Sequence, residues 1–240
     1  MNIARTKALS VSLLVISALG SSAVAFAGSY ATNGNFNTPT SSSVTWGTLS
    51  PGGGSVGGPG TVTWGPSQYG YDPTGINGWQ FSGGAGVQEN GSAWGFSNAP
   101  AGASQTAFLQ SGLTGSGSIS QEMTGLTIGQ TYTVTFDLEQ RPGYGADPVT
   151  VTIDGVSLTV TPPNDDQWTQ FTESFTANGT YEDLVFSVAG AGTNDNDTGL
   201  ADVSMTAPTP EPGTLLLLGT GLFGLAFVVF RKGNPSGQIL

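Results

Sequence analysis

The sequence contains no cysteine and no histidine. Without cysteine the chain has no disulfide bond and no cysteine nucleophile, and without histidine it has no Ser-His-Asp triad. The two absences also exclude zinc sites of the usual kind, whose ligands are cysteine and histidine. A structural metal would have to be bound by oxygen atoms, so calcium is the metal that the composition supports.

Basic residues are nearly as scarce. Four of the five lysine and arginine residues lie within the first seven or the last ten positions of the chain. Between positions 28 and 209 there is one base, Arg141, against 15 acidic residues, which gives this region a net charge of −14. Such a region cannot neutralise phosphates, so the sequence excludes nucleic acid as a partner. The dispersed acidic residues favour solubility outside the cell or the binding of calcium.

The first 27 residues have the pattern of a secretory signal peptide. Arg5 and Lys7 form a positively charged start, residues 8–19 are apolar, and Ala25-Phe26-Ala27 is a small-residue cleavage site. The sequence therefore predicts export through the general secretory machinery and a mature chain that begins at Gly28. A membrane anchor is the alternative interpretation, but the apolar stretch is short for one.

A second apolar run lies near the C-terminus. Residues 214–230 carry no charge over 17 positions. As a helix, this run would be roughly 25 Å long, the short end of a membrane span. Arg231 and Lys232 follow at once, where positive charge holds a tail in the cytoplasm. The sequence predicts a transmembrane helix over residues 214–230 and a basic cytoplasmic tail over residues 231–240, with a buried soluble helix as the alternative.

The triplet Pro210-Glu211-Pro212 precedes this run. The order of triplet, apolar helix and basic pair (Arg231 and Lys232) resembles the PEP-CTERM sorting signal of exported bacterial proteins. The resemblance implies recognition by an exosortase, an integral-membrane cysteine protease, with processing near the triplet. It also implies that the helix anchors the protein in the inner membrane only transiently, before the exported part reaches the cell surface or the extracellular space.

The region between the two signals shows strand patterns and no helical periodicity. Apolar and polar residues alternate over residues 131–139, which predicts one buried face and one solvated face. Glycine, at 38 of 240 residues, indicates many turns and loops. Short strands about ten residues apart predict an all-β fold, a β-sandwich over residues 28–206, followed by a linker over residues 207–213. The predicted strands are residues 78–81, 105–110, 116–123, 131–139, 149–153, 156–160, 167–177, 183–189 and 200–206.

The clearest element is a hairpin over residues 149–160. Asp154-Gly155 is the residue pair that a type I′ turn requires. A two-residue loop sets the register, and the apolar residues of both strands then fall on one face. The predicted pairs are Ile153 with Val156, Val151 with Leu158 and Val149 with Val160, alternating with Thr152 and Ser157, and with Thr150 and Thr159.

One residue interrupts the pattern of residues 167–177. Glu173 lies between Phe171 and Phe175, on the face that is expected to be buried. An acidic residue at this position predicts a bulge, an edge position in the sheet, or a carboxylate with a partner.

The domain also resembles the galactose-binding-like jelly roll, a fold that carbohydrate-binding modules share. The resemblance rests on short segments spread over the domain: Asn33-Gly34-Asn35-Phe36, Trp79, residues 118–121 and 132–136, Trp168, residues 175–177, and Ala201-Asp202-Val203-Ser204. It implies that the sandwich is a jelly roll whose first and last segments lie close together. In relatives that contain calcium, an acidic residue follows the first segment, and here that position is Asn37.

Two places are candidates for calcium. In the first, Asn35 and Asn37 would bind the ion together with Asp202 on the last strand. The second is the loop at residues 194–197, with Asp195 and Asp197. Because this loop lacks the full pattern of an EF-hand, a solvated turn is the alternative interpretation.

Several aromatic residues lie in glycine-rich, loop-like sequence, where exposed rings would suit sugar binding. The alternative is that the rings pack into small cores at the ends of the sandwich. The candidates for sugar binding are Trp46, Trp64, Tyr69, Tyr71, Trp94 and Tyr144, whereas Trp79 and Trp168 are expected in the core.

Catalysis would depend on carboxylates. Asp137 and Glu139 share one face of a strand, Glu173 is a third carboxylate, and paired carboxylates serve glycoside hydrolysis. Residues i and i+2 on a solvated face are, however, ordinary in an antiparallel strand. We therefore expect no enzyme.

The sequence as a whole predicts a non-enzymatic protein of the bacterial surface or extracellular matrix, structural or adhesive. The resemblance to sorted proteins implies an association with exopolysaccharide. A carbohydrate-binding module that uses the loop aromatics, with polysaccharide as its partner, is the alternative function. A glycoside hydrolase is the third.

Overall fold

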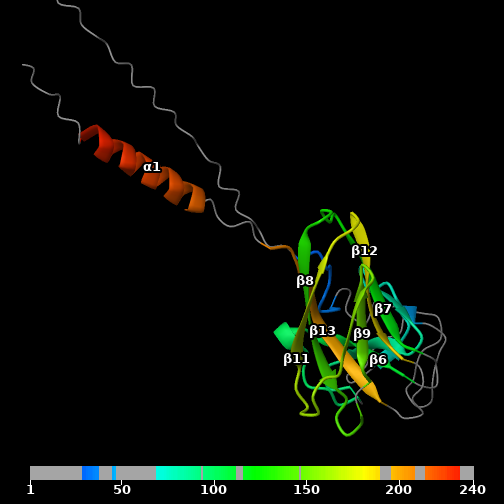
Figure 1. Cartoon of the computed structure of the whole chain (residues 1–240). Helices are drawn as coiled ribbons and strands as arrows, with labels where there is room; N and C mark the ends of the chain where they lie inside the picture. Colours follow the sequence, from blue (N-terminus) through cyan, green and yellow to red (C-terminus); the bar gives the residue numbers. More distant parts are fainter. Residues whose placement is uncertain are drawn as a thin grey trace, which may run out of the picture. The chain divides into compact units, whose positions relative to one another are not determined.

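The structure is a computed structural model that describes residues 29–37, 45–46, 69–92, 94–111, 116–145, 147–189, 196–208 and 214–232. The chain divides into two units, Ala27–Pro208 and the combined terminal segments Met1–Phe26 and Thr209–Leu240. The first unit contains β-strands, and the second contains helix α1, Thr214–Lys232 (Figure 1). The predicted signal peptide and the triplet at positions 210–212 lie outside the described residues.

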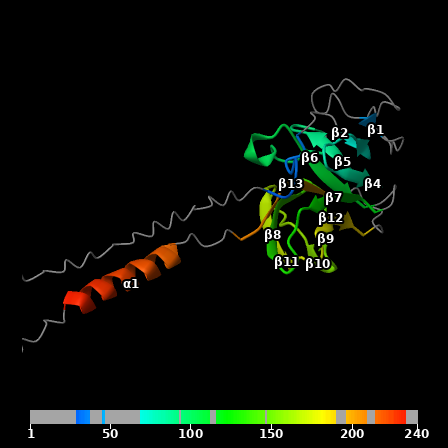
Figure 2. The same cartoon turned by 90° about the horizontal axis from the view of Figure 1, so that it is seen from above.

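The first unit has two antiparallel sheets that lie face to face (Figure 1, Figure 2). The five-stranded sheet has the order β10-β9-β12-β7-β4, and the six-stranded sheet has the order β11-β8-β13-β6-β5-β2. Strands β1 and β3 pair in a separate two-stranded sheet. The strands are β1 (Thr45–Trp46), β2 (Tyr69–Tyr71), β3 (Pro73–Thr74), β4 (Gln80–Ser82), β5 (Ala85–Glu89), β6 (Gln105–Gln110), β7 (Ser118–Thr124), β8 (Thr131–Gln140), β9 (Val149–Ile153), β10 (Val156–Val160), β11 (Thr169–Thr176), β12 (Tyr181–Val188) and β13 (Asp197–Thr206).

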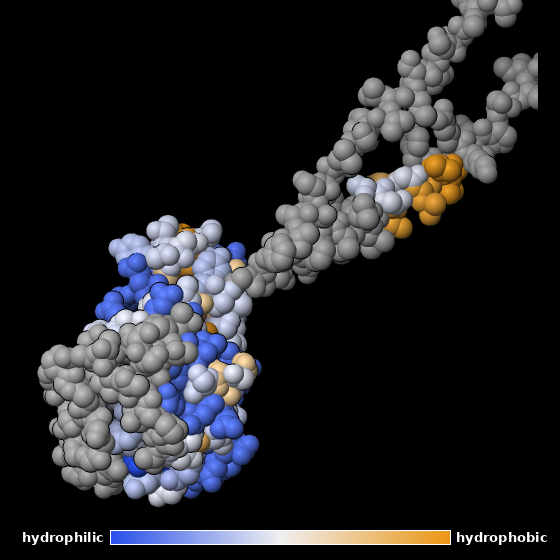
Figure 3. Space-filling model, turned by 180° about the vertical axis from the view of Figure 1, so that it is seen from behind, coloured by the Kyte–Doolittle hydropathy of each residue, from blue (hydrophilic) through white to orange (hydrophobic). Residues whose placement is uncertain are grey.

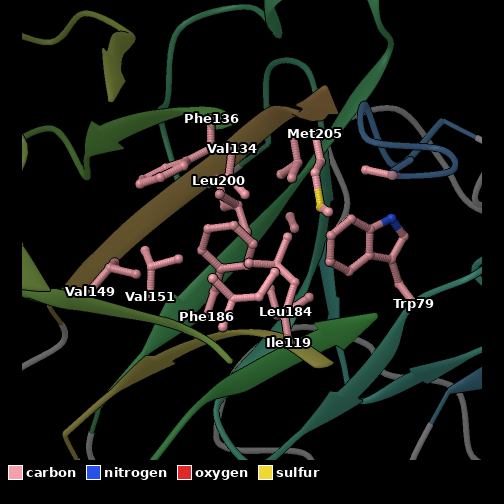
Figure 4. Packing of buried hydrophobic residues seen from close by; sticks show 14 of the residues in the cluster. Trp79, Ile119, Val134, Phe136, Val149, Val151, Leu184, Phe186, Leu200 and Met205 are labelled. Carbon is pink, nitrogen blue, oxygen red and sulfur yellow. The ribbon is translucent and has the colours of Figure 1, made fainter. Parts of the chain in front are cut away.

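The main core fills the space between the two sheets. In β8 the alternation directs Tyr132, Val134, Phe136 and Leu138 inward, and all four are buried. The ring of Phe136 meets that of Phe186, from the other sheet, in a T-shaped contact with centroids 5.2 Å apart (Figure 4). Such aromatic pairs contribute about 0.5–1.5 kcal/mol beyond the burial of their area. The predicted all-β jelly-roll sandwich is confirmed.

The β9–β10 hairpin has the predicted register, residue for residue. Asp154 and Gly155 have φ angles of 49° and 72°, as a type I′ turn requires. The three apolar residues of β9 are buried. Strand β10 is the edge of its sheet, and Val156 is therefore 40% exposed although it lies on the apolar face.

Strands β2 and β5 are not evident from the sequence pattern. Strand β5 reads Ala-Gly-Val-Gln-Glu and β2 reads Tyr-Gly-Tyr. Glycine and alanine are depleted in strands, so intrinsic propensity does not reveal these two. They form by pairing with a neighbour, β5 with β6 and β2 with β5.

Glu173 lies in an edge strand of the six-stranded sheet. It lies on β11, opposite Val134 of β8 and on the inward face. Because β11 is an edge strand, the side chain remains partly exposed rather than buried in the core. Of the three explanations that the sequence allowed, the edge position is confirmed.

The first described segment, residues 29–37, packs against the last strand. The Tyr30 N–H donates to the Met205 carbonyl oxygen at 2.7 Å. The ring of Phe36 is fully buried and lies 4.8 Å from the ring of Trp79. Trp79 is 4% exposed, which confirms its expected place in the core. The turn at residues 33–36 thus joins the beginning of the domain to its end.

Helix α1 contains the predicted apolar run, so its helical form is confirmed. Figure 3 shows hydrophobic surface on this helix and a mostly hydrophilic described surface on the sandwich. The exposed large apolar side chains of the helix are Leu222, Phe223, Leu225, Val228, Val229 and Phe230. A search of the described residues finds no helix that combines the length and hydropathy of a membrane span.

Candidate functional site

The aromatic residues that were candidates for sugar binding differ in exposure. Trp46 lies in β1, and Trp64 lies outside the described residues. Tyr71 and Trp94 are only 3% and 4% exposed, so for these two the alternative, that the rings pack into a small core, is confirmed, and the interpretation as exposed sugar-binding rings is wrong. Tyr144, at 44% exposed, presents its ring at the surface.

Tyr71 and Trp94 belong to a second aromatic cluster, separate from the main core. It lies on the outer face of the six-stranded sheet, because Phe108 of β6 alternates with two residues of the main core. The Trp94 ring lies 5.2 Å from that of Phe108 and 4.6 Å from that of Tyr69. We call this set the outer aromatic cluster; it consists of Tyr71, Trp94, Phe96 and Phe108, with Tyr69 and Trp168 partly buried against them.

The connection from β5 to β6, residues 90–104, covers this outer face, and we call it the covering segment. It supplies Trp94 and Phe96 to the outer aromatic cluster. Asn90 ties the segment together, since its Nδ2 donates to the Ala103 carbonyl at 2.9 Å and its Oδ1 accepts the Ala99 N–H at 2.8 Å. The part of the outer face that contacts the outer aromatic cluster is therefore shielded from water.

Two glycines allow the rings to lie directly on the sheet backbone. A Cβ atom on Gly86 would lie 2.5 Å from the Phe108 ring. A Cβ atom on Gly199 would lie 2.7 Å from the Trp168 ring and 3.1 Å from the Phe96 ring. Close-packed interiors leave no slack for such contacts, so a side chain at either position displaces a ring.

We expect Gly199→Ala to lower the free energy of unfolding by about 1–3 kcal/mol, the usual cost of overpacking. Urea unfolding followed by tryptophan fluorescence measures the change. Gly179→Ala is the control, since a Cβ atom there would meet nothing closer than 3.0 Å, the flexible end of Glu182. Equal losses in the two variants would contradict the close packing on Gly199.

Arg141, the single base between positions 28 and 209, is held between two rings. Its guanidinium carbon lies 4.0 Å from the centroid of the Trp94 ring and 3.9 Å from that of Tyr144. Its Nη1 lies 3.6 Å from Oδ2 of Asp197, whose side chain is fully buried. The Arg141 N–H also donates to the Asp197 carbonyl at 3.1 Å. One cation thus joins the covering segment, the start of β13 and the turn that carries Tyr144.

Asp137 and Glu139 lie on the same outer face of β8, but they are not solvated as the sequence led us to expect. Glu139 is fully buried, and its carboxylate accepts the Ser97 N–H at 2.9 and 3.2 Å. Asp137 is 9% exposed. Glu173 lies on the opposite face of the sheet. The three carboxylates therefore do not converge on one site, and the covering segment is the reason that Glu139 is dry.

Burial raises the pKa of three carboxyl groups, those of Asp137, Glu139 and Asp147. Burial is the largest cause in each case. The nearby charge of Asp202 raises the pKa of Asp137 further, whereas hydrogen bonds from serine residues lower the pKa of the other two in part. A raised pKa means that the folded state keeps protons that the unfolded state has already lost.

We therefore expect the free energy of unfolding to fall as the pH rises from about 4, the ordinary carboxyl pKa, through the raised folded-state values. Each unit of pKa difference corresponds to about 1.4 kcal/mol. Urea unfolding at a series of pH values from about 4 to neutrality measures how steeply the free energy of unfolding changes with pH. Glu139→Gln removes one of the three groups and should flatten the slope, while Glu122→Gln, at an exposed position, should not. Stability that rises with pH over this range would contradict the effect of burial.

The first calcium candidate forms a hydrogen-bonded turn. Asn35 Oδ1 accepts the Asn37 N–H at 3.1 Å. Asn37 Oδ1 accepts the N–H and the hydroxyl of Ser104 at 3.1 and 2.6 Å. Asp202 lies in the irregular part of β13, with a φ angle of 47°. The oxygen atoms of the two asparagines thus already have donors.

The second calcium candidate is only partly described. Asp195 lies outside the described residues, and Asp197 is the first residue of β13, where it pairs with Arg141. In the described part of the chain no group of three or more acidic residues is placed to bind a metal. Calcium binding stays a prediction.

Residues 208–232 match the model of the PEP-CTERM protein-sorting motif. The chain carries this sorting motif. The matched range contains the triplet Pro210-Glu211-Pro212, helix α1 and the basic pair Arg231 and Lys232, so the resemblance seen in the sequence is confirmed. No curated protein sequence matches the chain.

Solved structures similar to the chain include carbohydrate-binding modules and a tailspike domain. TmCBM61 in complex with β-1,4-galactotriose is 19% identical, with a TM-score of 0.41, over 55% of this chain and 89% of that chain. The CBM22-1 xylan-binding domain of Xyn10C from Paenibacillus barcinonensis is 11% identical, with a TM-score of 0.39, over 55% and 87%. The enzymatically active domain of tailspike protein 4 of bacteriophage CBA120 is 9% identical, with a TM-score of 0.41, over 55% of this chain but 20% of that one.

Proposed function

We propose that the protein is exported, sorted by an exosortase, and acts without catalysis as a structural or adhesive component of the cell surface or extracellular matrix, in association with exopolysaccharide. The match of residues 208–232 to the sorting motif carries this proposal. In it, helix α1 holds the protein in the inner membrane until processing near the triplet releases or re-anchors the sandwich.

The contacts of the carboxylates support a role without catalysis. The carboxylate of Glu139 accepts a backbone N–H, and that of Asp147 accepts the N–H and the hydroxyl of Ser111, each at 2.7 Å. A general acid or a nucleophile has to reach its substrate, whereas these carboxylates are buried and accept hydrogen bonds from other segments of the chain. The absence of cysteine and histidine also removes a thiol nucleophile and an imidazole base.

Expression of the full chain in two hosts tests the sorting. One host has an active exosortase, and the other has the same enzyme with its catalytic cysteine replaced. With the active enzyme, mass spectrometry should show a protein that begins at Gly28 and has lost Leu240. With the inactive enzyme, Leu240 should be retained.

Variants of this chain control the test. Replacing the triplet by three alanines should block processing, whereas Glu122→Ala, at an exposed position of β7, should leave it unchanged. Full-length protein with Leu240 intact as the main form in the host with active exosortase would contradict the proposal.

Tyr144 favours carbohydrate binding as a second candidate function. Its ring is 44% exposed, and the Arg141 guanidinium lies over one ring face at 3.9 Å. The contacts of Arg141 with Trp94 at 4.0 Å and with Asp197 at 3.6 Å hold the guanidinium in place. A ring that is already fixed loses little conformational entropy when a sugar stacks on it.

A glycan array of the mature protein tests this second function. We expect Tyr144→Ala to weaken binding at least tenfold. Tyr181→Ala is the control, because Tyr181 is also exposed, at 65%, but lies on β12, in the other sheet. Equal binding by both variants, or no binding to any acidic or neutral polysaccharide, would contradict a carbohydrate site at Tyr144.

A further inference from the structure

Each sheet of the sandwich has two edge strands, whose outward backbone groups are open to pairing with another chain. Among the described residues these edges are β10 and β4 in one sheet, and β11 and β2 in the other. Strands β2 and β4 have three residues each, and very short edge strands are one of the ways in which proteins discourage pairing with another chain. The two longer edges are β10, with five residues, and β11, with eight.

Strand β10 lacks the features that protect edges. It reads Val-Ser-Leu-Thr-Val, with no charge, no proline and no bulge against β9. Ser157 and Thr159 are exposed, Val156 is 40% exposed and Leu158 is partly exposed. Strand β11, by contrast, carries Glu173 on its inward face, and an added strand would bury that charge. The protein thus protects one long edge and leaves the other open.

We propose that β10 is a self-association strand, through which two copies of this chain pair antiparallel about a two-fold axis at Leu158. The pairing would join the five-stranded sheets of the two copies into one continuous sheet. A two-fold interface must be self-complementary, because the same residues serve both sides. The proposal does not depend on the sorting or the carbohydrate function.

The residue pattern of β10 meets this requirement. Read from either end, the strand shows the same order of residue classes: apolar, hydroxyl, apolar, hydroxyl, apolar. With the axis at Leu158, Val156 lies opposite Val160 of the second copy, and Ser157 lies opposite Thr159 of the second copy. Pairs of like class stabilise antiparallel sheets, and no acidic residue faces another within this ladder. The net charge of the domain therefore does not oppose the pairing at close range.

The backbone of β10 presents matching hydrogen-bonding groups. In a two-residue hairpin the residues beside the turn, here Ile153 and Val156, form a hydrogen-bonded pair, and such pairs alternate along the ladder. The N–H and C=O groups of Ser157 and Thr159 consequently point away from β9, toward the open edge. Around the two-fold axis these are the groups that two copies exchange, while Leu158 forms the non-hydrogen-bonded pair at the centre.

The pairing would also continue a row of hydroxyl contacts on the outer face of the hairpin. Hydroxyl pairs already connect the two strands, each at 2.9 Å: Thr150 with Thr159, and Thr152 with Ser157. Pairing at β10 sets the hydroxyl of Thr159 beside that of Ser157 from the second copy. On the other face it covers the exposed flanks of Val156 and Leu158, whose burial favours the dimer.

The absence of cysteine permits a direct test with the full chain. In the non-hydrogen-bonded pair at the axis, the two Cα atoms of position 158 lie about 4.5 Å apart, within the range of a disulfide. We expect Leu158→Cys to form a covalent dimer under mild oxidation, seen on a non-reducing gel. Ser174→Cys, on the edge strand β11, is the matched control and should give at least tenfold less dimer.

The register can be tested in the same way. Two copies of position 157 would be diagonal neighbours, about 7–8 Å apart and beyond disulfide reach, so Ser157→Cys alone should give little dimer. Mixing it with chains that carry Thr159→Cys should restore the crosslink. Equal crosslinking of Ser157→Cys alone and of the mixture would overturn the register and with it the proposed axis.

A measurement without cysteine separates pairing at β10 from association elsewhere. Light scattering in detergent should give the unmodified full chain twice the mass of the double variant Ser157→Lys/Thr159→Lys, in which like charges oppose each other. Both side chains are exposed, so the circular dichroism of the variant should be unchanged. A monomeric unmodified chain, or a dimer that persists in the lysine variant, would overturn the proposal, as would a Leu158→Cys yield no higher than that of Ser174→Cys.

Discussion

Replacing Arg141 with methionine should lower the melting temperature of the domain by roughly 6–20 °C. The change leaves the fully buried carboxylate of Asp197 without its cation. Removing one partner of a buried ion pair costs about 3–5 kcal/mol, because the other charge stays buried, and each kcal/mol shifts the melting temperature of a domain of this size by about 2–4 °C. Thermal unfolding followed by circular dichroism measures the shift.

Two further variants show whether the uncompensated charge of Asp197 causes the fall in melting temperature. The double variant Arg141→Met/Asp197→Asn also removes the buried negative charge and should recover most of the lost stability. Arg141→Lys keeps the charge but loses the flat guanidinium between Trp94 and Tyr144, so we expect an intermediate loss. A double variant as unstable as Arg141→Met alone would show that the charge of Asp197 is not what Arg141 compensates.

Gly34→Ala should detach the first segment of the domain from β13. A Cβ atom on Gly34 would lie 1.7 Å from the Val203 carbonyl oxygen, a backbone atom that cannot turn away. The Val203 N–H also donates to the Gly34 carbonyl at 2.9 Å, so relief of the clash breaks this bond. Movement of the segment would expose Phe36, and losing the burial of a phenylalanine costs about 3–5 kcal/mol, or roughly 6–20 °C in melting temperature.

Phe36→Ala is the matched variant for this experiment, because it removes the ring that anchors the same segment. The two changes act on one structural unit, so their combination should cost little more than either alone. Thermal melting gives the size of each loss, and limited proteolysis with N-terminal sequencing shows whether residues 29–37 are released. Strictly additive losses would mean that Gly34 and Phe36 do not act through the same segment.

Local patterns predicted the features that depend on residues close together in the chain. The β9–β10 register follows from Asp154-Gly155 and the alternation beside it, and the structure has that register. The sorting motif is likewise a contiguous stretch. Strand β6 also has the predicted bounds, Gln105–Gln110, and its apolar residues Ala107, Phe108 and Leu109 are adjacent in the chain.

The outer aromatic cluster and its charges could not be predicted in this way. The alternation of β8 correctly shows which face of the strand Glu139 lies on, but not that residues 90–104 cover that face. The only sequence signal for Arg141 is that it is a single base in an acidic region, which does not identify the rings or the carboxylate that surround it. Strands β2 and β5 were not predicted, because pairing with a neighbouring strand rather than a clear local pattern forms them.

The sequence by itself determined the sorting motif, the strand character of the domain and the pairing of its hairpin, because each rests on side chains a few residues apart. Only the tertiary structure decided that Glu139 is buried on the outer face of the six-stranded sheet, that Arg141 compensates Asp197, and that β10 and β11 are edges. Burial and edge position are properties of the order in which distant strands assemble. A single strand carries its own alternation, but its neighbours decide whether its polar face meets water, another segment or a second copy of the chain.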